Sequence, residues 1–295
     1  GVALDHGEAA EQGTMGADHD CSISGVGRHA PRFPTRFDAP PSACCPLRMT
    51  DRALALVTGA SSGIGEAFAH ALAARGFDMI VVARRADRLA SLAQRLHQTH
   101  GVEIRTVQAD LATPKGIEET LRAVESSERP LDLLVNNAGV GSYGAFSGLE
   151  ASRELQMVDL NVRAIVALTH HVLPRMIARG KGDIVQIAST TAFQPVPYMA
   201  TYGATKAFVL HFSEAIAREV QGTGVRVLAV CPGHTPTEFQ AVSGSARRSV
   251  RTTLQPAEQV VQEALDALDQ GRHVVITGRP NRALAQVSRV LPRRS

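Results

Sequence analysis

Short apolar runs alternate with longer segments of helical periodicity from residue 52 onward, and this alternation constrains the fold more than any other feature of the chain. The runs are rich in Val, Ile and Leu, as expected for strands buried on both faces of a sheet. Parallel strands joined by helices form right-handed crossover units, so the pattern predicts a single doubly wound α/β domain with a seven-stranded parallel sheet. The predicted strands are Ala53–Thr58, Met79–Ala83, Glu103–Gln108, Leu131–Asn136, Asp183–Ala188, Val225–Cys231 and His273–Thr277. The predicted helices are Glu66–Arg75, Arg88–His97, Lys115–Ser126, Ser152–Arg179 and Tyr202–Val220.

The segment 1–48 differs in composition from the rest of the chain. It is rich in Gly, Pro, Ser, His and acidic residues, and it shows no sustained helical or strand period. Prolines interrupt any element that could begin there, namely Pro31, Pro34, Pro40, Pro41 and Pro46. We therefore predict a disordered extension over 1–48 and a single nucleotide-binding domain over 49–295. Met49 is a candidate for the natural start of the protein.

The composition excludes several classes of function. A net charge of +3 over 295 residues is too small to indicate a nucleic-acid partner. No run of about 18 apolar residues occurs, and acidic residues stand where a signal peptide has its basic start, so we expect neither an integral membrane segment nor secretion. The cysteines lack the spacing of a zinc site, which indicates a reduced, cytoplasmic setting without a bound metal. They are Cys21, Cys44, Cys45 and Cys231.

A glycine-rich turn, Thr58–Gly65, connects the first predicted strand to the first predicted helix. Free backbone N–H groups and the dipole at such a helix N-terminus favour a pyrophosphate, and glycines let the backbone approach it. The turn therefore predicts a Rossmann-type dinucleotide site, with a plain strand-to-helix turn as the alternative. Its candidate cofactor-binding residues are Gly59, Ser61, Ser62, Gly63, Ile64 and Gly65.

The residues after the next two predicted strands bear on the choice of cofactor. The second strand ends at Ala83 and is followed by Arg84 and Arg85. An acidic residue there would accept the ribose 2′-hydroxyl of NAD, whereas guanidinium groups suit a 2′-phosphate. We therefore predict NADP(H) as the cofactor, with an exposed arginine pair as the alternative. Asp110 and Leu111 follow the third strand, where the carboxylate could accept a bond from adenine or cap a helix.

Tyr202 and Lys206 lie four residues apart at the start of a predicted helix, so their side chains share one face of it. A nearby ammonium stabilises phenolate and lowers the pKa of a tyrosine from its usual value of about 10. Such a tyrosine is a usable acid or base near neutral pH. The spacing alone is common by chance, so the pair gains meaning from the residues around it.

Taken together, the motifs resemble those of the short-chain dehydrogenase/reductase family, in its compact branch. Thr58–Gly65 is similar to the family's T-G-x-x-x-G-x-G turn, and Asn136–Gly139 is similar to its N-N-A-G. Tyr202 and Lys206 match its Y-x-x-x-K. The other matches are Asn161 in the long fourth helix, Ser189 at the end of the fifth strand, and Pro232-Gly233 after the sixth. These motifs occur in the family's order, on the expected elements.

The resemblance implies a role for each of these residues. Tyr202 protonates a carbonyl oxygen as hydride arrives from the nicotinamide, and Lys206 lowers the pKa of Tyr202 and bonds the nicotinamide ribose. Ser189 orients the carbonyl, and Asn161 holds a water of a proton relay. Further implied cofactor contacts are Asn137, Ala138, Gly139, Pro232, Gly233 and Thr235. Thr235 stands where the family has an apolar residue, which predicts a local change beside the carboxamide.

The resemblance thus implies an enzyme that transfers hydride between NADP(H) and a carbonyl or secondary alcohol. One alternative is a non-catalytic NADP(H)-binding redox sensor, which would tend to lose a catalytic residue. A sugar-nucleotide epimerase shares the tyrosine and lysine, but it usually needs a longer C-terminal domain than the segment 234–295 provides.

No motif names the substrate. Val140–Ser147, Gln194–Pro197 and the substrate loop 238–256 are expected to shape the substrate pocket. The resemblance also implies that the long fourth and fifth helices pack against a second subunit, in a homodimer or homotetramer. Arg282–Pro292 predicts an amphipathic helix that docks on the protein or, alternatively, on a membrane surface.

Overall fold

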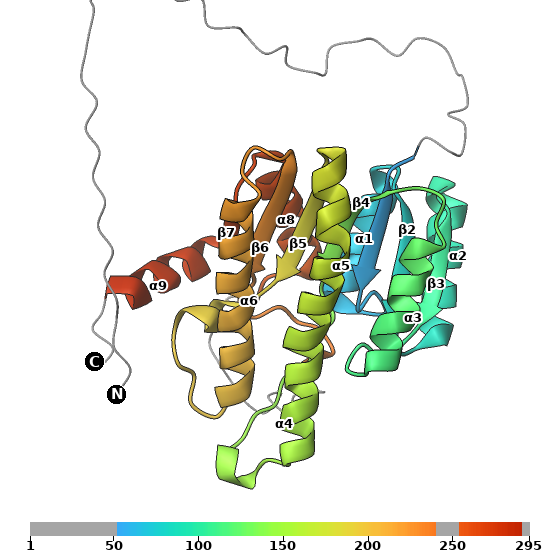
Figure 1. The fold of residues 1–295 in the computed structure, drawn as a ribbon. Coiled ribbons are helices and arrows are strands. Elements are labelled where there is room, and N and C mark those ends of the chain that lie inside the picture. The colour runs from blue at the N-terminus through green and yellow to red at the C-terminus, as the bar shows by residue number, and fades with distance from the viewer. Residues whose placement is uncertain (1–51, 240–253, 291–295) are drawn as a thin grey trace, which may run out of the picture. The chain divides into compact units, whose positions relative to one another are not determined.

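A seven-stranded parallel sheet forms the centre of the structure, a computed structural model that describes residues 52–239 and 254–290 (Figure 1). The strand order is β3-β2-β1-β4-β5-β6-β7, and every neighbouring pair is parallel. The strands are β1 (Leu54–Thr58), β2 (Asp78–Ala83), β3 (Ile104–Gln108), β4 (Leu131–Asn136), β5 (Gly182–Ile187), β6 (Val225–Cys231) and β7 (Val274–Ile276). Each predicted strand agrees to within one residue at either end, so the predicted doubly wound α/β fold is confirmed.

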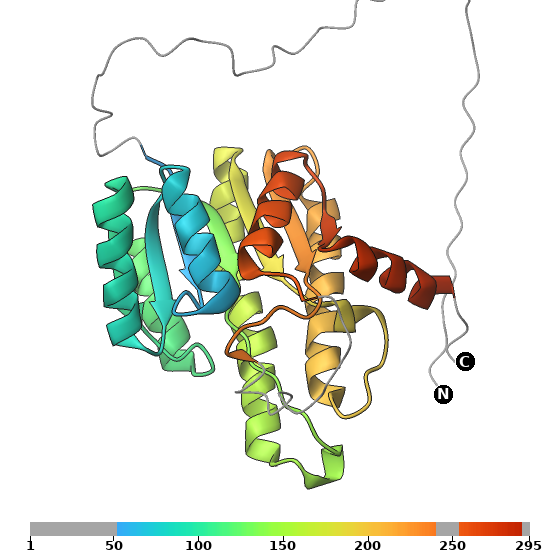
Figure 2. The same ribbon diagram turned by 180° about the vertical axis from the view of Figure 1, so that it is seen from behind.

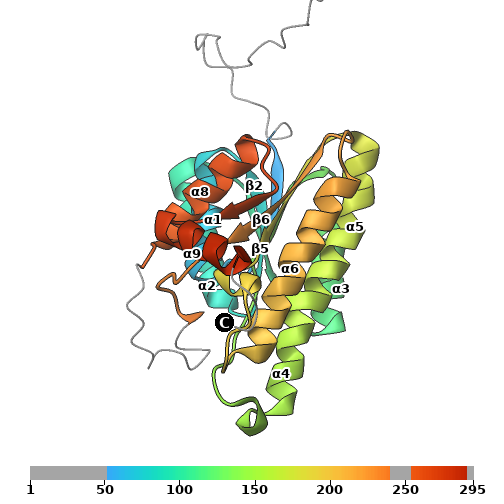
Figure 3. The same ribbon diagram turned by 90° about the vertical axis from the view of Figure 1, so that its left-hand side faces the viewer.

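Helices cover both faces of the sheet, as Figure 2 and Figure 3 show. One face packs against α1 (Gly63–Ala74), α2 (Ala86–His100) and α8 (Ala257–Asp269). The other face packs against α3 (Pro114–Glu125), α5 (Ala164–Arg179) and α6 (Ala200–Glu219). A large hydrophobic core forms on each side of the sheet, and a third, smaller cluster includes Val209 and Leu210 of α6.

The strands supply side chains to both cores, which explains why they read as continuous apolar runs. In β1, Ala55 and Val57 join the core under α1 and α8, whereas Leu54 and Leu56 join the core under α3 and α5. All four side chains are almost completely buried. Burial on both faces therefore selects apolar residues at consecutive positions of β1, whereas the edge strand β3 carries exposed polar side chains.

The chain enters the sheet near its centre, and this topology creates a binding crevice. β1 pairs with β2 on one side and with β4 on the other. The strands β2 and β3 follow one another away from β1 toward one edge of the sheet, and the chain then returns to form β4 on the other side of β1. The loops after β1 and β4 diverge at the carboxyl ends of these strands. Open α/β sheets bind their ligands at such a point.

Three helical segments differ from the prediction. The predicted helix 152–179 is divided into α4 (Ala151–Val158), a π-helical turn (Asp159–Arg163) and α5. The helix α8 was not predicted, and α9 (Arg279–Val290) begins before the predicted start at Arg282. Single π-helical turns within α-helices often mark functional sites, and this one contains Asn161.

Several predictions concern residues that the structure does not describe. The predicted extension 1–48, the segment 240–253 of the substrate loop and the C-terminal residues 291–295 lie outside the described ranges. Across 52–239 and 254–290, no helix combines the length and hydropathy needed to cross a bilayer. Within those same ranges, no group of three or more His, Cys, Asp or Glu side chains is arranged to hold a metal ion.

Candidate active site

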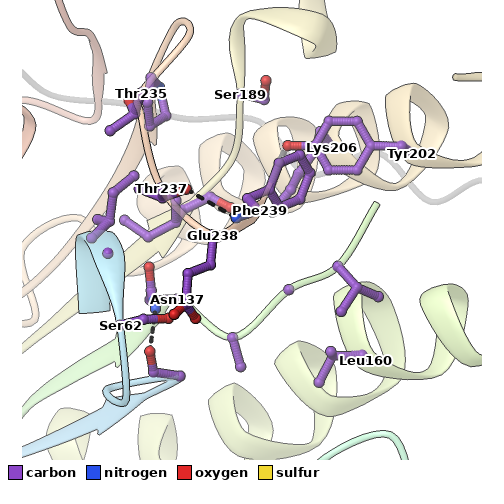
Figure 4. Close-up of a pocket in the computed structure, with 18 of the residues that line it drawn as sticks. Ser62, Asn137, Leu160, Ser189, Tyr202, Lys206, Thr235, Thr237, Glu238 and Phe239 are labelled. Atoms are coloured by element: carbon purple, nitrogen blue, oxygen red, sulfur yellow. Dashed lines mark hydrogen bonds between the residues drawn. The ribbon is translucent and has the colours of Figure 1, made fainter. Parts of the chain in front are cut away.

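A cleft of about 510 Å3 opens at the carboxyl ends of the strands. Figure 4 looks into it, with Ser62 and Asn137 near one end and Ser189 and Tyr202 near the other. The predicted site residues all line this cleft except Gly65 and Asn161. Those two lie behind its wall, where Gly65 packs on the glycine-rich turn and Asn161 bonds the backbone of Val140. The fold therefore brings the predicted residues together.

The glycine-rich turn needs glycine at three positions. Gly59 and Gly63 have φ values of +66° and +59°, in the left-handed region that other residues rarely adopt. A Cβ on Gly65 would collide with the carbonyl oxygen of Gly59 and the side-chain amide of Asn137. The turn thus presents the N-terminus of α1 to the cleft, where free N–H groups and the helix dipole suit an anion.

Thr58 and Asn137 connect this turn to the end of β4. Thr58 Oγ1 accepts hydrogen bonds from the backbone N–H groups of Asn137 at 2.9 Å and Ala138 at 3.0 Å. Asn137 Nδ2 donates to the carbonyl oxygens of Thr58 at 2.9 Å and Gly59 at 3.2 Å. These bonds fix the two loops that border the cleft, so the Asn137 side chain braces the turn while the residue also lines the cleft.

Arg85 binds the same turn from the end of β2. Its Nη2 donates to Ser61 Oγ and Ser62 Oγ, each at 2.9 Å, and its Nε donates to Ser61 Oγ at 3.2 Å. Arg84 also lines the cleft, but its side chain is exposed. Of the two predicted arginines, Arg85 is therefore the one that hydrogen bonds fix beside the glycine-rich turn.

Glu238 contacts Arg85 from the opposite wall of the cleft. Glu238 Oε2 accepts a bond from Arg85 Nη1 at 2.6 Å, and Glu238 Oε1 accepts one from Arg88 Nη1 at 2.6 Å. The hydrogen bonds from Arg85 and Arg88 lower the pKa of Glu238 to about 2. The carboxylate is therefore ionised near neutral pH.

Asp110 and Leu111 border the cleft after β3, as the sequence predicts. Asp110 Oδ1 accepts a hydrogen bond from the backbone N–H of Ala112 at 3.0 Å. The residue that caps α3 is Thr113, whose Oγ1 accepts a bond from Gly116 N at 3.0 Å. Asp110 is thus not the helix cap; it stabilises the turn before the cap.

Tyr202 and Lys206 are both buried and lie on one face of α6, with Lys206 Nζ 5.8 Å from the centre of the Tyr202 ring. Lys206 Nζ donates to the carbonyl oxygen of Ile187 at 2.7 Å. Burial lowers the pKa of Lys206 to about 8. Burial also raises the pKa of Tyr202 to about 12, against the opposing effect of a hydrogen bond with Ser189.

The pKa of Tyr202 therefore moves in the direction opposite to the one expected from Lys206 alone. In this cleft the cost of burying a phenolate exceeds the stabilisation that the hydrogen bond with Ser189 provides. Tyr202 is protonated near neutral pH as a result. A protonated phenol is the form that can donate a proton to a carbonyl oxygen.

Ser189 lies in extended backbone just after β5 and is 8% exposed. Its Oγ accepts a bond from Thr191 N at 3.2 Å and so caps the short 3-10 helix Thr190–Phe193. The same hydroxyl interacts with Tyr202. Ser189 therefore caps this short helix and contacts the tyrosine at the same time.

Asn161 is fully buried in the π-helical turn and is anchored at both ends of its amide. Its Oδ1 accepts from Val140 N at 3.0 Å, and its Nδ2 donates to Val140 O at 2.9 Å and to Thr205 Oγ1 at 3.1 Å. Asn161 Oδ1 and Lys206 Nζ both border Gly139, within 3.5 Å of where its Cβ would stand. The side chain thus fixes the loop after β4 against the face of α6 that carries Lys206.

The segment after β6 forms the remaining wall. Pro232 and Gly233 line the cleft, and a Cβ on Gly233 would collide with the side chain of Asn281 from α9. Thr235 is buried, with its Oγ1 3.4 Å from the carbonyl oxygen of Gly233. The C-terminal helix therefore contributes Asn281 to the cleft.

The aromatic side chains of Tyr143, Tyr202 and Phe239 line the cleft. The Phe239 and Tyr202 ring centres are 5.2 Å apart, and those of Tyr143 and Tyr198 are 5.9 Å apart. Tyr198 has a φ of +68°, a strained conformation for a residue other than glycine. Tyr143 and Phe239 belong to segments that the sequence predicts to shape the substrate pocket, and Tyr198 directly follows a third.

Among the site residues that were not predicted individually are Thr58, Glu238, Phe239 and Asn281, although Glu238 and Phe239 fall within the predicted substrate loop 238–256. Thr58 could have been found, because it begins the glycine-rich motif and a hydroxyl there is positioned to meet the end of the neighbouring strand. The positions of the other three depend on the path of the chain after β6, and no sequence pattern indicates that path.

Comparison with known proteins agrees with this geometry. Residues 53–248 match the family described as short chain dehydrogenase. The chain is 38% identical over 189 residues to serine 3-dehydrogenase of Agrobacterium fabrum, a match that covers 63% of this chain and 74% of that protein. It is 35% identical over 230 residues to glycine betaine reductase ATRR of Emericella nidulans, a match that covers 76% of this chain but spans only 18% of that protein. Its structure resembles a short-chain dehydrogenase from Sphingobium yanoikuyae in complex with NADPH, with a TM-score of 0.73, 33% identity and coverage of 82% of this chain and 98% of that one.

Proposed function

Because the chain belongs to the short-chain dehydrogenase/reductase family of oxidoreductases, which act on alcohol and carbonyl substrates with NAD(P)H, we propose that it is an NADP(H)-dependent enzyme that interconverts a carbonyl and a secondary alcohol. One observation carries the proposal: a single cleft contains the glycine-rich turn, Arg85 and the pair formed by Tyr202 and Lys206.

The residues of the cleft fit a dinucleotide. The N-terminus of α1 and the left-handed glycines of the turn suit a pyrophosphate, and Asp110 suits the adenine. Pro232, Gly233 and Thr235 lie where they could border the nicotinamide, and Lys206 Nζ could bond its ribose. When bound, NADP(H) supplies or accepts the hydride, whereas the protein positions the reactants and moves the proton.

The side chains near Tyr202 suit the proton transfer. In the reductive direction, Tyr202 Oη donates its proton to the substrate oxygen, and Ser189 Oγ donates a hydrogen bond to that oxygen as negative charge develops. The phenolate left behind is stabilised by the ammonium of Lys206, which with a pKa of about 8 is largely charged at neutral pH. Asn161 supports the path by which Tyr202 regains its proton, because it lies with Lys206 against Gly139.

Arg85 supports NADP(H) over NAD(H). Its guanidinium is held beside Ser61 and Ser62, at the end of β2 where the adenosine ribose would lie. A guanidinium and two hydroxyls can together bind the oxygens of a phosphate monoester by charge-assisted hydrogen bonds. The similar Sphingobium yanoikuyae enzyme is described in complex with NADPH.

The proposal includes self-association as a homodimer or homotetramer. The helices α5 and α6 carry partly exposed apolar side chains, including Val166, Ile177 and Phe208. Such side chains on long neighbouring helices suit a contact with a second copy. Light scattering of the purified protein tests this, and a monomer would contradict it.

The test of the proposed function is oxidation of NADPH and of NADH against a panel of aldehydes, ketones and 3-oxoacyl thioesters. Turnover with NADPH that exceeds turnover with NADH is the expected result. Faster turnover with NADH would refute the cofactor assignment. Tight NADPH binding without turnover of any carbonyl would favour the alternative, a redox sensor, against which the presence of Asn161, Ser189, Tyr202 and Lys206 counts.

A further inference from the structure

Glu238 forms a carboxylate bridge between two arginines at one end of the cleft. Its two oxygens each accept a 2.6 Å hydrogen bond, one from Arg85 and one from Arg88. Arg85 and Arg88 belong to the end of β2 and the first turn of α2, whereas Glu238 follows β6. Figure 4 shows the Glu238 side chain extending across the cleft toward Ser62. The bridge therefore joins walls that are far apart in the sequence.

Arg85 is held in an orientation that suits the binding of an anion. The Nε and Nη2 groups of Arg85 donate hydrogen bonds to the hydroxyls of Ser61 and Ser62. These bonds orient the guanidinium and direct Nη1 toward Glu238. A carboxylate and a phosphate monoester both accept hydrogen bonds from a guanidinium in this way. Under the proposed function, the 2′-phosphate of the cofactor needs the same guanidinium.

We propose that Glu238 is a specificity-determining residue, which competes with the 2′-phosphate for Arg85 and Arg88 and thereby limits the preference of the cleft for NADP(H) over NAD(H). The inference rests on the proposed function. A nucleotide with the 2′-phosphate must displace the carboxylate, and the two anions repel each other at close range. A nucleotide with a free 2′-hydroxyl leaves both ion pairs in place.

Glu238 carries its negative charge throughout the neutral pH range, so it can compete with the 2′-phosphate at any pH in that range. Its pKa of about 2 keeps the carboxylate ionised, so the arginines face a competing anion whenever the site is free. The side chains of Glu238 and Arg88 are each 44% exposed, and that of Arg85 is 39% exposed. Ion pairs this accessible are weak and screened by salt, so the bridge is one that a phosphate can displace.

The experiment compares two nucleotides that differ in the phosphate. We would measure calorimetric binding of 2′,5′-ADP, which carries the 2′-phosphate, and of 5′-AMP, which lacks it, to the wild type and to Glu238→Gln. The substitution keeps the shape of the side chain and removes its charge. We expect 2′,5′-ADP to bind about threefold to tenfold more tightly to Glu238→Gln, which corresponds to the loss of two exposed ion pairs. We expect the affinity for 5′-AMP to stay unchanged.

The matched control is Glu118→Gln on α3. Glu118 is exposed and forms a 2.6 Å ion pair with Arg122, but it does not line the cleft. This variant makes the same chemical change and the same change in net charge. It should bind both nucleotides as the wild type does.

Three results would overturn the inference. A general effect of charge would appear in one of two ways: Glu238→Gln would bind both nucleotides more tightly by the same factor, or Glu118→Gln would bind 2′,5′-ADP as tightly as Glu238→Gln does. Unchanged or weaker binding of 2′,5′-ADP to Glu238→Gln, with a wild type that still prefers 2′,5′-ADP, would refute the competition alone. A wild type and a Glu238→Gln variant that both bind 2′,5′-ADP no more tightly than 5′-AMP would refute the proposed NADP(H) preference, and the competition with it.

Discussion

Replacement of Lys206 by methionine is expected to stabilise the folded protein at neutral pH. Lys206 is 4% exposed, and burial lowers its pKa from 10.5 to about 8. Since a change of one in pKa corresponds to about 1.4 kcal/mol, the buried ammonium costs about 3 kcal/mol of folding free energy at pH 7. Methionine has a similar volume without the charge. It leaves the Ile187 carbonyl oxygen without its 2.7 Å donor, which costs about 1–2 kcal/mol, so a net gain of about 1–2 kcal/mol remains.

The dependence of this gain on pH isolates the lysine. Between pH 8 and pH 10.5 the unfolded chain, with its ordinary lysine pKa, binds more protons than the folded chain, so the stability of the wild type rises with pH in that window. The variant lacks this contribution. Its advantage should therefore shrink by about 2–3 kcal/mol from pH 7 to pH 10. In the folded wild type, Tyr202 titrates above this range, because burial raises its pKa to about 12.

Urea unfolding of the cofactor-free protein, followed by circular dichroism at several pH values, measures the difference. Lys115→Met is the control, because the Lys115 side chain is 83% exposed and its removal should produce no such trend. The reasoning is refuted if Lys206→Met is less stable than the wild type at pH 7 and its difference from the wild type is independent of pH. A trend of equal size in Lys115→Met would refute it as well.

Three other substitutions test separate parts of the site. Arg85→Ala removes the guanidinium beside the serines and should weaken NADPH binding about 10-fold to 100-fold in a fluorescence titration, while equal weakening of NADH would contradict its assignment to the 2′-phosphate. Asn137→Ala removes two hydrogen bonds to the glycine-rich turn and should lower the free energy of unfolding by about 1–3 kcal/mol, whereas unchanged urea stability would show that they do not brace the fold. Phe239→Ala removes the ring that packs on Tyr202 and should change KM for the carbonyl more than kcat; a loss confined to kcat would argue against a role in substrate binding.

The strands were predictable because burial on both faces leaves a simple signature. Val57 and Leu56 are neighbours in β1 that face opposite cores, so neither position accepts a polar residue. The helix α8 was not predicted, although its sequence carries an equally clear pattern. Its buried side chains recur at helical spacing, at Val260, Val261, Ala264 and Leu268. By contrast, the π-helical turn at Asn161 depends on hydrogen bonds to the loop after β4, which is distant in sequence.

The site was predictable where its residues stand at strand ends, because the carboxyl ends of parallel strands meet at one edge of the sheet. Asp110 was found in this way, whereas Ser189 and Gly233, which also follow strands and line the cleft, were assigned through the family resemblance. The direction of the pKa of Tyr202 was predicted wrongly, because the sequence reveals the neighbouring Lys206 but not the depth of burial. The contact of Glu238 with Arg85 could not be foreseen either, since no pattern fixes which wall of the cleft the residue faces.

The most direct test of the proposed reaction is hydride transfer in a single turnover, with NADPH deuterated at the transferred position and a carbonyl accepted by the wild type. Tyr202→Phe and Tyr143→Phe each remove one phenol hydroxyl from the same cleft. The account predicts deuterium on the carbonyl carbon of the product, a rate about 100-fold or more lower in Tyr202→Phe, and a rate near that of the wild type in Tyr143→Phe. A Tyr202→Phe variant that transfers the label at the rate of the wild type would contradict the assignment of Tyr202 as the proton donor.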